Sequence, residues 1–234
     1  MKIDSVIGLG FGDEGKGKVV AFLSSPSQRP QDLKNGLVIR HSGGQQASHT
    51  VIGNGLEHRF SQFGSGTLNG YHTYLPEMCT FDPIGFLEEA KHLEQLRFQA
   101  QMEKAPDVFI NNNIMITTPY DIVANHIVEG RNQHGSCYQG FGQTIERNEI
   151  GHHSLNFYHV MSETVLRMKL DLINKYYHRR LGDKYFQYLR EFNPDIDAFV
   201  KSLMDAKKLP YVMLINYPEN LTKVITDCNH IIFE

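Results

Sequence analysis

The stretch Ser5 to Lys18 reads SVIGLGFGDEGKGK, and it combines an apolar run, a glycine-rich turn and two lysines. Val6, Ile7 and Leu9 predict a short buried strand, and the lysines stand where a helix begins. The glycines between them let the backbone bend and approach a ligand closely. Unpaired N–H groups and the helix dipole favour anions at a helix N-terminus, and Lys16 and Lys18 add positive charge. The stretch therefore predicts a phosphate-binding loop.

The spacing of this loop matches known phosphate loops only in part. Gly10 precedes Gly15 and Lys16 at the Walker A distance, but Gly17 stands where that motif has a Mg²⁺-binding hydroxyl. Asp13 is therefore the predicted metal ligand, because Mg²⁺ in such sites is held by carboxylates and phosphate oxygens. A dinucleotide-binding turn fits less well, since four charged side chains crowd this loop. The alternative is a glycine-rich turn whose charges are simply solvated. That interpretation does not explain why so many glycines and lysines stand together.

The composition is that of a soluble globular protein. The chain has 234 residues, of which 41% are hydrophobic and 21% charged, and its net charge is −3. It is long enough to bury a sizeable core. With no dominant basic block, no long apolar run and no signal-peptide pattern, we expect a cytoplasmic protein that binds neither nucleic acid nor membrane. Cys79, Cys137 and Cys228 are too few and too far apart for a disulfide framework.

A second polar loop follows a second predicted strand. A helix is expected from Lys18 to Leu23, and the apolar residues Leu37 to Ile39 predict a strand that ends in the loop Arg40 to Thr50. Ligands in open α/β sheets bind at the carboxyl ends of the strands, so both loops should face one site. His49 lies in the second loop, where an imidazole can act as an acid or a hydrogen-bond donor. The alternative is that His49 is simply one of twelve histidines on the surface.

The rest of the chain supplies a scaffold. Helices are predicted after Asp82-Pro83, from Ser162 onward and after Asn193-Pro194, and strands at residues 108–110, 114–116 and 231–233. The helix after Ser162 is marked by the apolar positions Val165, Met168, Leu172 and Tyr176. The alternation of strands and helices predicts an α/β fold of the P-loop-like nucleotide-binding kind, with a mostly parallel central sheet flanked by helices.

These motifs resemble those of the adenylosuccinate synthetase family. Residues 12–18 read GDEGKGK, as in the family, and residues 40–50 resemble its R-x-x-GG-x-NAGHT segment. Looser similarity links residues 58–66 to H-x-IPSG, residues 135–142 to GTTGRGIG, and residues 231–234 to the strand that leads into FEGAQG. The resemblance implies one α/β domain over residues 1–234, similar to the N-terminal part of the family, with a helical insertion at about 155–208.

The resemblance also implies a reaction. Family members use GTP and Mg²⁺ to phosphorylate the 6-oxygen of IMP, and L-aspartate then displaces the phosphate to give adenylosuccinate. Asp13 would take the N1 proton and bind Mg²⁺, His49 would support the phosphoryl group, and the backbone carbonyl of Ser48 would be a second metal ligand. The implied partners are IMP or dIMP, GTP, L-aspartate and a second copy in a homodimer.

The binding residues carried over from the family form two sets. The GTP or phosphate contacts are Gly12, Asp13, Glu14, Gly15, Lys16, Gly17, Lys18, Ser48, His49 and Thr50. The contacts to the nucleotide substrate are Asp13, Lys16, Gln46, Ser48, His49, Ser136, Cys137 and Arg147, the last standing for an arginine that a neighbouring subunit contributes.

The chain departs from the family pattern around the nucleotide. Gln46 replaces an Asn, Ser48 a Gly, Cys137 a phosphate-binding Thr and Gln139 an Arg. A thiol is a weak hydrogen-bond donor, so Ser136 is the alternative contact to Cys137. The departures indicate an atypical branch, of a viral or archaeal kind. Family members also continue past this point with aspartate-binding and guanine-reading segments, so we expect either a fragment or a reduced homologue.

Three other functions stay open at this stage. One is synthesis of 2-aminoadenylosuccinate from GMP or dGMP, although Asp13 favours a hypoxanthine nucleotide because relatives that take guanine have a smaller residue there. Another is a nucleotide-binding phosphohydrolase or kinase that passes phosphate to water or another acceptor. The third is an inactive homologue that keeps the fold.

Overall fold

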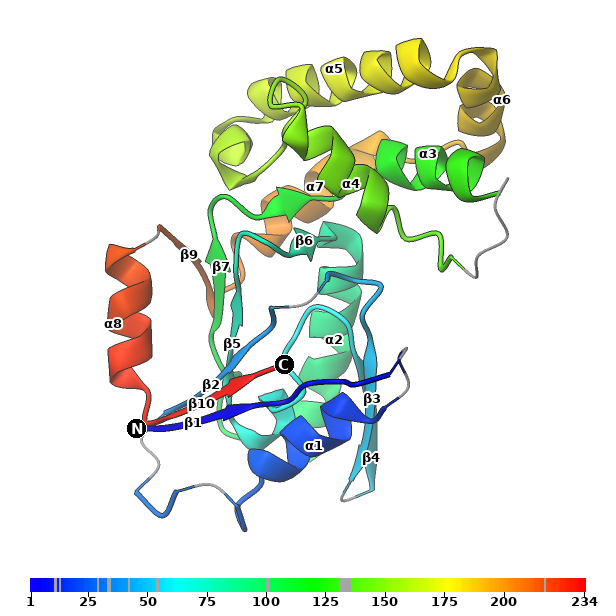
Figure 1. Ribbon diagram of the computed structural model, residues 1–234. Coiled ribbons are helices and arrows are strands. Elements are labelled where there is room, and N and C mark those ends of the chain that lie inside the picture. The colour runs from blue at the N-terminus through cyan, green and yellow to red at the C-terminus, as the bar shows by residue number, and fades with distance from the viewer. Residues whose placement is uncertain are drawn as a thin grey trace.

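A six-stranded parallel sheet forms the centre of the protein (Figure 1). The computed structural model describes residues 1–10, 12, 14–28, 30–32, 35–41, 43–53, 55–99, 102–130, 136–216 and 218–234. In spatial order the strands are β1 (Lys2–Ser5), β10 (His230–Phe233), β2 (Gly36–Ile39), β5 (His72–Leu75), β7 (Val108–Asn111) and β9 (Val212–Ile215). All neighbouring pairs are parallel. The sheet confirms the predicted α/β fold class, and β10 brings the last residues of the chain between β1 and β2.

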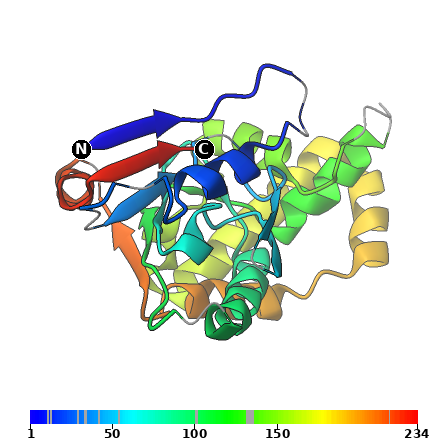
Figure 2. The same cartoon turned by 90° about the horizontal axis from the view of Figure 1, so that it is seen from below.

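Helices cover both faces of this sheet. α8 (Glu219–Asp227) packs on one face, and α1 (Lys16–Leu23) and α2 (Pro83–Gln99) pack on the other (Figure 2). The side chains of β2 alternate accordingly, because Leu37 and Ile39 belong to the apolar cluster under α8 and Val38 to the cluster under α1. Every residue of β2 is buried, as expected for a central strand that is covered on both sides.

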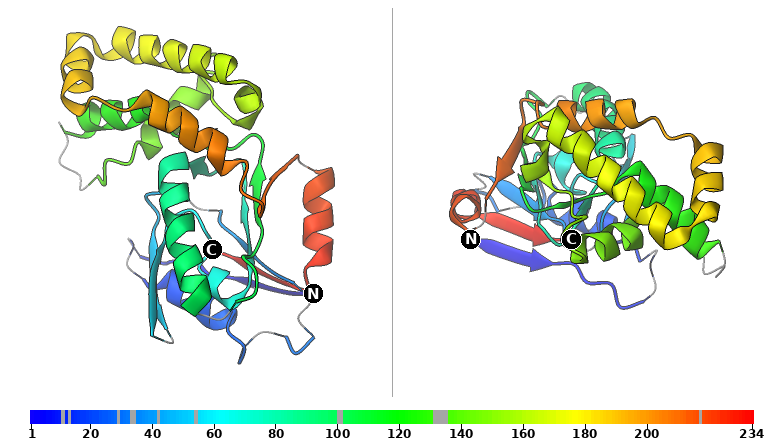
Figure 3. Two further views of the ribbon diagram at one scale, coloured as in Figure 1. Left: turned by 180° about the vertical axis from the view of Figure 1, so that it is seen from behind. Right: turned by 90° about the horizontal axis from the view of Figure 1, so that it is seen from above.

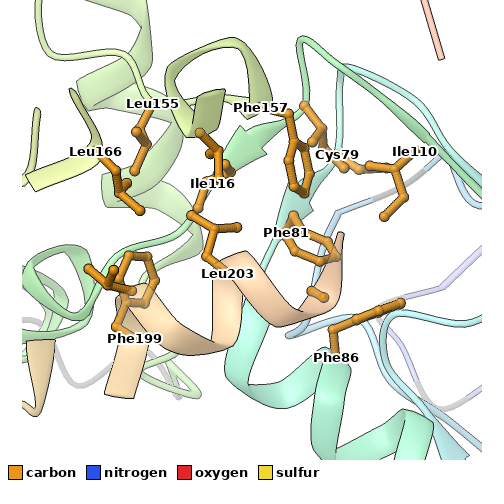
Figure 4. Close-up of a cluster of buried hydrophobic side chains, with 14 of the residues drawn as sticks. Cys79, Phe81, Phe86, Ile110, Ile116, Leu155, Phe157, Leu166, Phe199 and Leu203 are labelled. Atoms are coloured by element: carbon orange, nitrogen blue, oxygen red, sulfur yellow. The ribbon is translucent and has the colours of Figure 1, made fainter. Parts of the chain in front are cut away.

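A layer of helices lies beyond one end of the sheet (Figure 3). It consists of α3 (Pro119–Glu129), α4 (Phe141–Glu149), α5 (Glu163–Leu181), α6 (Asp183–Phe192) and α7 (Ile196–Ala206). The short strands β6 (Thr80–Phe81) and β8 (Met115–Ile116) join it to the sheet, and one apolar cluster runs through the junction (Figure 4). That cluster contains Phe81 and Phe86 together with Phe199 and Leu203 of α7. The predicted insertion at about 155–208 contains α5, α6 and α7, and its definition as a separate insertion stays a prediction.

The first strand differs from the prediction. Val6, Ile7 and Leu9 were expected to form it, but β1 ends at Ser5; Val6 is buried, whereas Ile7 is 73% and Leu9 97% exposed. β1 is an edge strand that pairs only with β10, and Asp4 bonds to His230 on that neighbour. Backbone pairing with β10 therefore forms β1, although the polar side chains of β1 do not predict a strand.

Two further expectations need correction. His49 and Thr50 were placed in a loop, but they begin β3 (His49–Gly53), which forms an antiparallel hairpin with β4 (Leu56–Phe60). α5 forms as predicted, yet Val165, Met168 and Leu172 are exposed. Its buried residues are Leu166, Leu170, Ile173 and Tyr177.

None of the described helices is long and apolar enough to cross a bilayer.

Candidate functional site

The predicted phosphate loop connects the end of β1 to the start of α1. Gly12 and Gly15 have φ angles of 113° and 73°, which other residues rarely adopt, and Gly15 is the N-cap of α1. The Glu14 carboxylate accepts a hydrogen bond from the backbone N–H of Gly10 at 2.5 Å, and this bond holds the pKa of Glu14 below its usual value. Lys16 Nζ lies 3.5 Å from Glu14 Oε2. Asp13, the predicted base and metal ligand, lies outside the described residues.

Four segments meet beside the first turn of α1. A Cβ atom on Gly17 would lie 2.4 Å from His49 Cβ and 2.9 Å from Ser65 Oγ, so only glycine allows α1 to approach the hairpin this closely. His49 Nε2 lies 3.8 Å from Glu234 Oε1. The structure thus brings the predicted residues Gly17 and His49 together with Ser65 and Glu234, which the sequence analysis did not assign to the site.

Glu234 follows directly after β10, at the carboxyl end of a central strand. Its carboxylate accepts hydrogen bonds from the backbone N–H of Ser65 at 3.1 Å and from the Ser65 hydroxyl, and its side chain is fully buried. The signal that could have found it is its position, since ligands bind where parallel strands end. A buried carboxylate at that edge is a functional candidate on this ground alone.

Arg40 holds the two loops around His49 in place. It lies at the end of β2 and is only 4% exposed. Its guanidinium donates hydrogen bonds to the carbonyl of Phe63 at 3.1 Å and to the carbonyl of Ala47. A charged donor that satisfies two buried carbonyls fixes both segments relative to the sheet. Arg40 belongs to the motif read from the sequence, but its structural role was not predicted.

The surroundings of His49 favour a neutral ring in the free protein. Burial lowers the pKa of His49, the Glu234 carboxylate raises it, and the positive charges of Arg40 and Lys16 lower it further, with a net shift below the usual value. The neutral imidazole has one N–H donor and one acceptor nitrogen. An arriving phosphate would add negative charge and favour protonation of the ring.

Two loops that contain predicted residues touch each other. Gln45 Nε2 donates to the carbonyl of Gln139 at 2.7 Å, and this bond joins the loop of Gln46 to the loop of Ser136 and Cys137. Both glutamines line a polar cavity of about 760 Å³. Its volume falls in the range of small-molecule sites, which is roughly 300–1,000 Å³. The two loops that the resemblance assigns to the nucleotide substrate are therefore neighbours.

The remaining predicted residues have local surroundings of their own. Thr50 is exposed on the hairpin, Lys18 is exposed and lines an apolar cavity beside α1, and Gln46 accepts a bond from the N–H of Gly44 at 3.1 Å. Cys137 is an exposed free thiol, and the Ser136 hydroxyl accepts a hydrogen bond from the N–H of Tyr138.

Arg147 does not fit the predicted contact to a nucleotide. Its side chain is fully buried and pairs with the Asp121 carboxylate, with Nε 2.7 Å from Oδ1 and Nη2 3.0 Å from Oδ2. It also donates to the carbonyls of His153 and Ile116. An arginine that reaches into a neighbouring subunit must be exposed, so this interpretation of Arg147 is wrong. The sequence shows an arginine in a polar helix and gives no sign of its burial.

The proposed metal ligands are only partly within the described residues. Among those residues, no three His, Cys, Asp or Glu side chains gather as a metal site. Ser48 is the residue before His49, so its backbone lies beside the start of α1, and its hydroxyl accepts a hydrogen bond from Arg59 Nε at 2.7 Å. A carbonyl oxygen there and the Asp13 carboxylate are hard oxygen donors, which suit Mg²⁺.

Sequence comparison relates this chain to known proteins. A family profile described as adenylosuccinate synthetase matches residues 5–234. Adenylosuccinate synthetase of Buchnera aphidicola subsp. Schizaphis graminum is 29% identical over 234 residues, which cover 98% of this chain and 50% of that protein. The enzyme of Borrelia turicatae is 29% identical over 194 residues, which cover 80% of this chain and 42% of the relative. The chain thus spans about half the length of the curated relatives it matches.

Solved structures share its fold. Fully ligated adenylosuccinate synthetase from Plasmodium falciparum superposes with a TM-score of 0.67 at 16% identity, over 99% of this chain and 50% of that chain. The cyanophage S-2L succinoaminodeoxyadenylate synthetase (PurZ), bound to dGMP and dATP, has a TM-score of 0.60 at 13% identity, over 100% and 50%. With the family profile covering nearly every residue and the fold agreeing, the chain belongs to the adenylosuccinate synthetase family.

Proposed function

We propose that this chain carries the phosphoryl-transfer centre of a GTP-dependent ligase that joins L-aspartate to a 6-oxopurine nucleotide. The observation that carries the proposal is the meeting of His49, Glu234 and Ser65 against Gly17, at the start of α1. Phosphate would bind the N–H groups at the start of α1 and Lys16, and the purine nucleotide would bind between the loops of Gln46 and Ser136.

Each residue has a role that its chemistry supports. Asp13 would accept the N1 proton of the purine, which makes the 6-oxygen a nucleophile, and His49 would hydrogen-bond to the phosphoryl group as it is transferred. Positioning and electrostatics supply most of the acceleration of phosphoryl transfer, and a histidine packed tightly against the phosphate loop suits that task. L-aspartate would then displace the phosphate from carbon 6 to give adenylosuccinate.

Mg²⁺ would be held by Asp13 and the Ser48 carbonyl, together with phosphate oxygens of GTP. When bound, the ion neutralises negative charge on the phosphates. The proposed ligase further acts as a homodimer, a state that the family resemblance implies.

The choice of purine is a separate part of the proposal. A carboxylate at position 13 can accept the N1 proton, and the resemblance implies a smaller residue there in relatives that take guanine nucleotides, which favours IMP or dIMP. The cyanophage relative is bound to dGMP, so dGMP is the informative competitor. The test is to incubate the chain, or a full-length protein that contains it, with GTP, Mg²⁺, L-aspartate and each nucleotide in turn, and to identify products by mass spectrometry.

We expect adenylosuccinate from the hypoxanthine nucleotide, and its loss in Asp13→Ala and in His49→Ala, because each removes a group that acts on the transition state. Product from dGMP and none from IMP would contradict the choice of purine. Phosphate release without an aspartate adduct would contradict the ligase and favour a phosphohydrolase. A matched control is Ile52→Ala, since Ile52 lies on the same strand as His49, is exposed and belongs to neither predicted set of contacts.

A further inference from the structure

The contacts of Glu234 and His49 suggest that one acts through the other. We infer that Glu234 is a positioning residue for His49: its carboxylate orients the imidazole so that Nε2–H faces Glu234 and Nδ1 is left for the phosphoryl group. This inference rests on the proposed function, in which His49 contacts that group.

The Glu234 carboxylate is held in a fixed place. It accepts hydrogen bonds from the Ser65 backbone N–H at 3.1 Å and from the Ser65 hydroxyl. The backbone of Glu234 continues the sheet, with its N–H donating to the carbonyl of Ile39 at 2.9 Å and its carbonyl accepting from the N–H of His41 at 3.1 Å. A fully buried carboxylate whose side chain and backbone are both hydrogen-bonded can orient a neighbouring ring.

The His49 side chain is packed against the start of α1. Its Cβ and Cγ atoms pack against Gly17, and Nε2 lies 3.8 Å from Glu234 Oε1. This distance is longer than a hydrogen bond, but bonds between catalytic groups are often long without ligand and shorten when it binds. An ionised carboxylate only accepts hydrogen bonds, so the nitrogen that faces it carries the proton. Nδ1 is bonded to Cγ and lies on the part of the ring nearer to Gly17.

Within the described part of the chain, Arg40 and Lys16 bond to groups other than Glu234, whose carboxylate accepts from Ser65 and lies beside the imidazole. The Arg40 guanidinium donates to the carbonyls of Phe63 and Ala47, and Lys16 lies beside Glu14. Because the partner bond of one ring nitrogen determines which tautomer forms, Glu234 should determine the tautomer of His49.

The experiment reads the tautomer directly. Nitrogen-15 chemical shifts of the His49 ring are measured by NMR in the full chain, at one mildly alkaline pH where the ring is neutral. In the wild type we expect the tautomer with the proton on Nε2. In Glu234→Gln we expect a mixture of both tautomers, because an amide can face the ring with either its oxygen or its NH₂ group.

The matched control is Glu89→Gln. Glu89 also holds this loop, since its carboxylate accepts hydrogen bonds from the backbone N–H groups of Ser61, Gln62 and Phe63, but among the described residues no hydrogen bond or ion pair joins it to His49. The Nε2–H tautomer should persist in this variant. Persistence in Glu234→Gln, or equal loss in both variants, would overturn the inference. If Glu234→Gln fails to fold, a dominant Nδ1–H tautomer in the wild type would also overturn it.

Activity gives a second readout. In a chain that forms adenylosuccinate, Glu234→Gln should lower kcat on the order of a hundredfold with little change in the KM for GTP, because orientation of His49 matters most in the transition state. A rise in KM at unchanged kcat would contradict the positioning role. If the wild type forms no product, the ligase proposal fails, whereas the tautomer measurement still decides the role of Glu234.

Discussion

Gly17 offers a sharp test of the geometry at the site. It is the second residue of α1, and replacing it with alanine would place a Cβ atom 2.4 Å from His49 Cβ and 2.9 Å from Ser65 Oγ. Neither neighbour can retreat easily, since His49 is in β3 and Ser65 is bonded to Glu234. Gly17→Ala should therefore force the hairpin away from α1.

The magnitude follows from two opposing contributions. Alanine in place of glycine stabilises a helix by about 0.5–1 kcal/mol. Overpacking a tight contact costs about 1–3 kcal/mol. Gly142 is the matched control, because it is the second residue of α4 and a Cβ atom there would meet nothing within 4 Å. The helix contribution is common to both substitutions, so the difference between them isolates the contact.

The assay is urea denaturation, which gives the free energy of unfolding of the wild type and both variants. Gly142→Ala should be more stable than the wild type, and Gly17→Ala less stable than Gly142→Ala by about 1–3 kcal/mol. If both variants gain the same stability, then α1 and the hairpin do not approach as described, and the arrangement of His49, Ser65 and Glu234 is refuted.

Three further predictions concern the loop, the helical layer and the response to pH. Lys16→Ala should weaken Mg²⁺-dependent binding of GTP by about 2–4 kcal/mol in calorimetry, because it removes a charged contact to phosphate; equal affinity would exclude this contact. Asp121→Asn should lower the free energy of unfolding by about 3–5 kcal/mol, since it leaves the buried Arg147 charge without its carboxylate; a loss below about 1 kcal/mol would contradict it. Burial, opposed by Asp107, holds the pKa of His72 below its usual value, and its Nδ1 accepts the N–H of Asp107 at 2.8 Å. Its contribution to stability is therefore present above about pH 6.5 and lost as the pH falls through the folded pKa, and His72→Asn should flatten that part of the stability curve.

The local sequence indicated the glycine-rich loop and several of the helices and strands. Glycines, acids and lysines are rarely combined as in residues 12–18 unless they bind phosphate. The predicted helix at α1 and the predicted strands at β2, β7 and β10 are present in the structure. The predicted residues Gly17 and His49 do meet. These features depend on residue type and short-range spacing, which a single sequence displays directly.

Tertiary packing decided which residues are buried and which strands pair. α5 carries apolar residues on more than one side, and only contact with the other helices of the layer selects Leu166, Leu170 and Tyr177 over Val165 and Met168. The polar strand β1 exists because β10 offers it backbone partners.

The site itself depends on the same long-range pairing. Glu234 reaches Ser65 and His49 only because β10 inserts between β1 and β2, which brings the last residue of the chain to the phosphate loop. Arg147 enters the core because Asp121, from another helix, neutralises its charge there. Such contacts join residues far apart in the chain, so their energy is set by the fold as a whole and leaves no local pattern in the sequence.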